Sequence, residues 1–159
     1  MTIAPCKYPR RPPRLSLVFQ SVPLLYFVTF NTYKRKAMLA HQSVHAQFID
    51  FSATARTHNV TVGRYVIMPD HIHLFVRMPT EGISLVKWMQ ALKSILGKKL
   101  IIDGYPKPHW QEGFFDHLLR SGESYSEKWE YVRQNPVRKG LVSNPDAWAY
   151  QGEINRICW

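Results

Sequence analysis

Two histidines separated by a single residue, His71 and His73, are the clearest sign of chemistry in this sequence. They lie in a segment with the pattern of a strand, and successive strand side chains point to opposite faces, so both imidazoles point the same way. Two imidazoles placed like this can share one metal ion. The spacing alone is weak evidence, because two histidines in a strand are more often exposed polar residues than ligands.

A second candidate group is Tyr131 with Asn135, four residues apart on a segment with a helical pattern. Its apolar stripe comprises Tyr125, Trp129 and Val132, and Tyr131 falls roughly 120° from the centre of that stripe at about 100° per residue. Tyr131 is therefore not an obvious core residue, and the amide oxygen of Asn135 could complete a metal site. A phenol that attacks a phosphate at neutral pH needs a proton acceptor and a neighbouring cation. Without the histidines, a tyrosine packed on the surface is the better interpretation.

The other histidines form no convincing site. His41 and His45 have the spacing of a zinc-protease helix, but Gln42 stands where that motif needs its glutamate base, so surface histidines are favoured. Asp116 and His117 adjoin an expected strand and could support the metal ligands indirectly.

The elements that must position these residues follow from hydrophobic periodicity. Strands are predicted at residues 24–31, 60–68, 71–78 and 114–119, with Pro69 and Asp70 in a tight turn. Amphipathic helices are predicted at residues 40–58 and 84–100, and a third should begin at the capping box of Ser124 and Glu127 and stop before Pro136.

This order of elements predicts an α+β fold, a ferredoxin-like or RRM-like antiparallel sheet with helices packed on one face. The other face would be free for a nucleic acid. The 159 residues suit one domain, and we expect a flexible basic arm rich in Pro and Arg at 1–22, a catalytic domain at 23–150 and a tail at 151–159.

The charge balance favours a polyanionic partner. Lys and Arg number 21 against 11 Asp and Glu, a formal charge of +10, although cationic chains also bind membranes or acidic proteins non-specifically. Cys6 and Cys158 show no paired spacing, which argues against disulfides and a cysteine-rich zinc site and suits the cytoplasm. The apolar run at 15–30 is short and interrupted, so we expect neither export nor a membrane span.

Residues 65–74 (YVIMPDHIHL) resemble the metal-site strand of REP-associated tyrosine transposases, single-tyrosine enzymes of the insertion-sequence-200-like type in the His-hydrophobe-His superfamily. The resemblance covers about residues 24–148, because further family motifs follow in order: residues 26–29 (YFVT), 110–111 (WQ), 115–117 (FDH), 131–137 (YVRQNPV) and 140–142 (GLV). Residues 146–150 and the Arg/Pro arm depart from the family pattern, which leaves the DNA target sequence open.

The resemblance implies that His71 and His73 are metal ligands, Tyr131 is the nucleophile and Asn135 is a third ligand. It implies cleavage of single-stranded DNA near a hairpin, with Mg²⁺ or Mn²⁺ as cofactor and no nucleotide cofactor. Tyr131 would become joined to the 5′ phosphate and a 3′ hydroxyl would be released. Relatives include monomers and homodimers, so either state is expected.

Basic side chains in the arm, in the second helix and after Tyr131 are candidate DNA contacts, and Phe75 or Trp110 could stack on bases. The basic candidates are Arg10, Arg11, Arg14, Lys87, Lys93, Lys98, Lys99, Arg133, Arg138 and Lys139. Each alone is more often a solvated charge. Two alternatives to a strand transferase stay open: a non-catalytic module of the same fold that binds single-stranded nucleic acid, and a phosphodiesterase in which water attacks.

Overall fold

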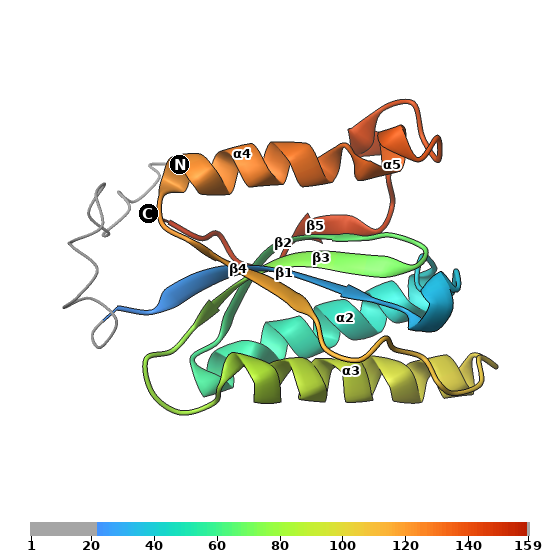
Figure 1. The fold of residues 1–159 in the computed structure, drawn as a ribbon, viewed down its shortest axis with the longest axis horizontal. Coiled ribbons are helices and arrows are strands. Elements are labelled where there is room, and N and C mark those ends of the chain that lie inside the picture. The colour runs from blue at the N-terminus through green and yellow to red at the C-terminus, as the bar shows by residue number, and fades with distance from the viewer. Residues whose placement is uncertain (1–21, 159) are drawn as a thin grey trace.

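A computed structural model of the chain describes residues 22–158 (Figure 1). Its centre is a five-stranded sheet in the order β4-β1-β3-β2-β5, in which every neighbouring pair is antiparallel. The strands are β1 (Leu24–Asn31), β2 (Thr61–Ile67), β3 (His71–Met78), β4 (Phe115–Leu119) and β5 (Gln151–Glu153). The predicted antiparallel α+β class is confirmed.

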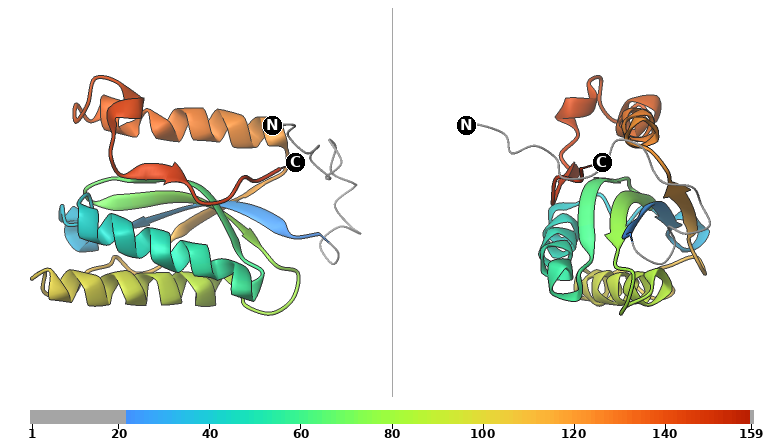
Figure 2. Two further views of the ribbon diagram at one scale, coloured as in Figure 1. Left: turned by 180° about the vertical axis from the view of Figure 1, so that it is seen from behind. Right: turned by 90° about the vertical axis from the view of Figure 1, so that its left-hand side faces the viewer.

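Helices lie on both sides of this sheet (Figures 1 and 2). On one side are α2 (Gln42–Thr54) and α3 (Leu85–Ile102), and on the other is α4 (Gly122–Arg133), which leads into the short α5 (Asn135–Arg138). Short 3-10 turns connect these elements: η1 (Tyr33–Arg35), η2 (Ala55–His58) and η3 (Pro145–Ala147). No helix in residues 22–158 is long and apolar enough to cross a membrane.

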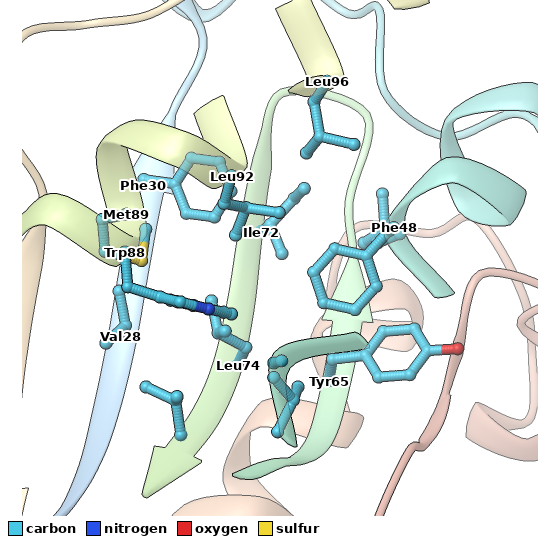
Figure 3. Packing of buried hydrophobic residues seen from close by; sticks show 14 of the residues in the cluster. Val28, Phe30, Phe48, Tyr65, Ile72, Leu74, Trp88, Met89, Leu92 and Leu96 are labelled. Carbon is cyan, nitrogen blue, oxygen red and sulfur yellow. The ribbon is translucent and has the colours of Figure 1, made fainter. Parts of the chain in front are cut away.

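The main core lies between the sheet and the pair α2 and α3. The stripe predicted for α3 points into it, so that Met89, Leu92 and Leu96 are fully buried. They pack with Trp88 against the apolar face of β1 and β3 and near Phe48 of α2 (Figure 3). Each such side chain contributes about 1.5–3 kcal/mol through its removal from water.

The second sheet face is not free, and the expectation that all helices pack on one side is wrong. Phe27 of β1 and Phe75 of β3 are buried on this face, where they form a smaller core with Tyr125 and Val132 of α4. Phe75 meets Tyr125 edge to face, with ring centroids 4.7 Å apart. Because the strands carry large apolar residues on both faces, a second helical layer is required. Phe75 is thus a core residue and cannot stack on a base.

The bounds of the third helix differ from the prediction. Ser121, not Ser124, caps it: its Oγ accepts a hydrogen bond from the backbone N–H of Ser124 at 3.1 Å. The helix α4 ends at Arg133 as expected, but Pro136 then lies in the first turn of α5. Proline is tolerated there, because the N–H groups of a first helical turn have no acceptor within the helix.

Residues 151–158, expected as a tail, belong to the folded domain. The strand β5 pairs with β2, and Ile157 is buried in the second core. Gly63 makes this possible, because a Cβ at that position would lie 2.5 Å from Cδ1 of Ile157. Arg77 donates a hydrogen bond to the backbone oxygen of Cys158 at 2.6 Å. Nearly all of the predicted arm, including Arg10, Arg11 and Arg14, lies outside the described residues.

Candidate active site

The two histidines of β3 converge as the strand alternation predicts. His71 Nε2 and His73 Nε2 are 3.1 Å apart. A divalent cation with metal–nitrogen bonds of about 2.1 Å holds two ligands at right angles roughly 3.0 Å apart. The spacing of the two nitrogens therefore fits two neighbouring positions on one cation.

The opposite ring nitrogen of each histidine is held by a neighbour. His71 Nδ1 lies 2.7 Å from Asp70 Oδ1, and His73 Nδ1 lies 2.7 Å from Thr29 Oγ1. A carboxylate only accepts, so it keeps the proton of His71 on Nδ1 and leaves the Nε2 lone pair free. Asp70 and Thr29 thus orient the two rings, which is how proteins fix metal-binding histidines.

A third neighbour, Arg35, completes this support. Its Nε donates to Asp70 Oδ2 at 2.8 Å, and it also bonds Asn31 Oδ1. Arg35 has a φ of 55°, a left-handed conformation that is uncommon outside glycine and is held here by these contacts. Burial of Asp70 raises its pKa, but the hydrogen bond from His71 and the charge of Arg35 outweigh this and hold the pKa below its usual value.

Both histidines are neutral at physiological pH. Burial lowers the pKa of His73 to about 3, helped by His71 and by the charges of Arg138, Arg35 and Lys128. Burial also lowers the pKa of His71, more than the hydrogen bond to Asp70 raises it. Neutral imidazoles are the form that binds a metal. Among residues 22–158, no three His, Cys, Asp or Glu side chains gather as a metal site.

Tyr131 lies on α4 and is 65% exposed. The guanidinium of Arg138 lies over its ring, 4.2 Å from the centroid, and donates to the Tyr131 backbone oxygen at 2.8 Å. Arg138 also donates to Asn135 Oδ1, so Tyr131, Asn135 and Arg138 form one cluster. Asn135 is helical, contrary to the expectation that Pro136 would keep it out of a helix, and it begins α5 directly after Gln134, the cap of α4. Pro136 has no N–H to donate to the carbonyl four residues back, which accounts for the break between the two helices.

This cluster faces the histidine side of the sheet. Lys128, one turn before Tyr131, lies over the ring of Phe27 at 5.3 Å, and Phe27 stacks on His73 with centroids 5.5 Å apart. The charge of Lys139 also acts on His71. The tyrosine, the histidines and four cationic side chains therefore share one region: Arg35, Lys128, Arg138 and Lys139.

Asp116 and His117 of β4 do not support the histidines directly. Asp116 is opposite Val28, whose side chain lies in the main core, so Asp116 points to the face away from the histidines. His117 is opposite Phe27 and shares the histidine face, but β1 separates it from β3. The supporting role falls instead to Thr29, Arg35 and Asp70. Of these, only Asp70 gave a sequence signal, as an acid directly before His71.

Of the seven predicted basic contacts in residues 22–158, four lie on the other side of the sheet. Lys87, Lys93, Lys98 and Lys99 are on α3, across the sheet from the histidines. The Lys93 ammonium donates to the backbone oxygens of Gln111, at 3.1 Å, and Gly113, and Lys99 pairs with Asp103. Arg133 pairs with Glu130 and Asp146. Trp110 donates to the Lys93 backbone oxygen and packs on the main core. Of the predicted basic contacts in residues 22–158, Arg138 and Lys139 are the two whose charges act on the histidines.

The sequence of the chain matches a known family of proteins. Residues 21–135 match the family model described as Transposase IS200 like. The chain is 28% identical over 94 residues to a Haemophilus influenzae protein assigned to the REP-associated tyrosine transposases, a match that covers 53% of each protein. It is 22% identical over 129 residues to the REP-associated tyrosine transposase of Escherichia coli K12, covering 79% of this chain and 73% of that protein. The chain thus spans about half of one relative and nearly three quarters of the other.

Two solved structures share the fold. One is a REP-associated tyrosine transposase bound to a REP hairpin, with a TM-score of 0.62, 21% identity, and coverage of 80% of this chain and 75% of that one. The other is a Deinococcus radiodurans protein assigned to the transposases, with a TM-score of 0.51, 16% identity, and coverage of 71% of this chain and 91% of that one.

Proposed function

The chain belongs to the IS200-like transposase family, and we propose that it cuts and rejoins single-stranded DNA at hairpin-associated sites. The observation that carries this proposal is the convergence of His71 Nε2 and His73 Nε2, 3.1 Å apart, beneath the helix that presents the exposed Tyr131. The hairpin follows from the similar transposase whose structure contains a REP hairpin. The net charge of +10 suits a DNA substrate.

In the proposed reaction, the hydroxyl of Tyr131 attacks a backbone phosphate. The new bond joins the phenolic oxygen of Tyr131 to the 5′ phosphate, and the bond between the phosphorus and the 3′ oxygen of the neighbouring sugar breaks. That 3′ oxygen takes up one proton and is released as a hydroxyl, which balances the proton that the phenol loses. The phosphotyrosine keeps the energy of the phosphodiester, so rejoining needs no nucleotide cofactor. Mg²⁺ or Mn²⁺ held by His71 and His73 would polarise the scissile phosphate and neutralise its charge.

Arg138 has two roles in this proposal. Its guanidinium, together with Lys128 and Lys139, attracts the phosphate toward Tyr131. It also occupies Asn135 Oδ1, the oxygen we assign as the third metal ligand. If Arg138 turned to a DNA phosphate, that oxygen would become free to bind the metal.

The test is a covalent adduct between the protein and a labelled hairpin with single-stranded flanks, scored on a denaturing gel with Mg²⁺ or Mn²⁺. Tyr131→Phe should abolish the adduct, because it removes only the attacking hydroxyl. Tyr105→Phe makes the same change on the α2 and α3 side of the sheet and should leave the adduct intact. An adduct that survives in Tyr131→Phe would refute the assignment.

The same experiment separates the two alternatives. If Tyr131→Phe still cuts the strand and no product is ever bound to protein, water is the nucleophile. If the chain binds hairpin strands in the presence of a chelator and cuts none with either metal, the chain is a binding module.

A further inference from the structure

Phe115 is a large apolar residue in an unusual position. It is 59% exposed on β4, an edge strand of the sheet. The preceding residue, Phe114, packs against the main core, so by strand alternation Phe115 points to the opposite face, the one that carries the histidines. An aromatic ring left in water at the edge of a sheet gains little for folding.

The strand register aligns Phe115 with the metal-binding pair. Phe115 is directly opposite Thr29 of β1, and Thr29 is directly opposite His73 of β3. Directly opposite residues point to the same face, and two strand spacings amount to about 10 Å. Thr29 is also the residue that holds His73 Nδ1, so one row across the sheet runs from the exposed ring to the proposed metal site.

The surroundings of Phe115 suit a nucleotide. The charges of Lys128 and Arg138 act on His73, at the inner end of this row, where a phosphate would bind. Farther along β4, a hollow of about 440 Å³ is lined by His117, Leu119 and Ser124, among others. The helix α4 covers Phe27 and Leu119 in the second core but leaves Phe115 in solvent.

We propose that Phe115 is a stacking platform for an unpaired base that flanks the scissile phosphate. This role rests on the strand-transfer function proposed above. With the phosphate at the histidines and the backbone beside the cations, a neighbouring base reaches the open face of Phe115. Stacking on an aromatic ring accepts any base, so Phe115 fixes the position of the strand and does not read its sequence.

The test measures binding in a chelator, so that no cleavage occurs. A hairpin with a single-stranded flank is prepared in versions that each lack one flank base. The wild-type chain should lose between about 5-fold and 100-fold in affinity at one position. Phe115→Ala should bind the complete strand more weakly by a similar factor and show no further loss at that position.

Two further variants keep the test falsifiable. Phe115→Trp retains an aromatic face and should show the wild-type loss of affinity when the same flank base is removed. Ile102→Ala removes an apolar side chain that is 75% exposed on α3, and should leave the affinity for every version of the strand unchanged. If Phe115→Ala loses as much affinity as the wild-type chain when each flank base is removed, Phe115 does not stack on a base. The proposal also fails if the only effect of Phe115→Ala is a change of oligomeric state in light scattering, because β4 would then be a contact between copies of the chain.

The adduct assay distinguishes this inference from the proposed function. Suppose that the wild-type chain forms the adduct and that Phe115→Ala responds to the removal of each flank base as the wild-type chain does. This result would refute the stacking role and remain consistent with strand transfer. A missing adduct combined with the altered profile would refute strand transfer and support Phe115 as the base platform of a binding module.

Discussion

Replacement of Asp70 by Ala should weaken metal binding without removing a ligand. Asp70 Oδ1 accepts from His71 Nδ1 at 2.7 Å, which keeps the Nε2 lone pair available. Arg35 Nη2 lies 3.3 Å from the same Nδ1 and can only donate. Without the carboxylate, the guanidinium favours the tautomer with an unprotonated Nδ1, which places the proton on Nε2 and blocks that ligand.

The expected loss of metal affinity follows from the contact between Asp70 and His71. Loss of a residue that orients a metal-binding histidine typically costs 10- to 100-fold in affinity, or about 1.4–2.7 kcal/mol. We expect Asp70→Ala near the upper end, because Arg35 remains and stabilises the wrong tautomer. The double change of Asp70→Ala with Arg35→Ala should recover part of the affinity, since the competing donor is then gone.

Mn²⁺ binding followed by electron paramagnetic resonance measures this directly at pH 7.5, without DNA. Asp50→Asn removes one negative charge from an exposed position on α2 and serves as the control, with affinity close to wild type. His71→Ala should abolish specific binding. Equal Mn²⁺ affinity in Asp70→Ala and the wild-type chain would refute the orienting role, and equal affinity in His71→Ala would refute the metal site itself.

Three other expectations concern stability, measured by urea denaturation. Ile157→Ala should lower the free energy of unfolding by about 2–4 kcal/mol, because Ile157 is buried beside Gly63; a change near zero would mean that the C-terminal segment is dispensable. Lys93→Ala should cost about 1–3 kcal/mol and leave DNA affinity unchanged, since its ammonium serves loop carbonyls; a loss of affinity at equal stability would make it a DNA contact. Burial lowers the pKa of His45, so below about pH 6.5 the unfolded chain binds more protons than the folded one, and stability should fall as the pH drops from 7 to 5.5. His45→Phe should reduce that fall, and an undiminished slope would assign it to other groups.

The sequence predicted a helix or strand well where its residues follow a single hydrophobic period, that of a strand or that of a helix. Strand alternation placed His71 and His73 on one face, and the helical stripe placed Tyr131 away from the core. Both follow from backbone geometry, which repeats within a few residues. The antiparallel class followed from the order of the elements.

Contacts between segments that are distant in the sequence decided how the site is assembled. The contacts of His73 with Thr29 and of the second core with α4 join segments that lie more than 40 residues apart. No local period encodes which residue stands opposite which, because the register depends on the packing of all strands at once. For this reason the sequence could point to the two histidines and the tyrosine as candidates. Only the tertiary structure revealed that Asp70, Thr29 and Arg35 orient the histidines, that Lys93 serves a loop, and that Phe115 stands in the same row as His73.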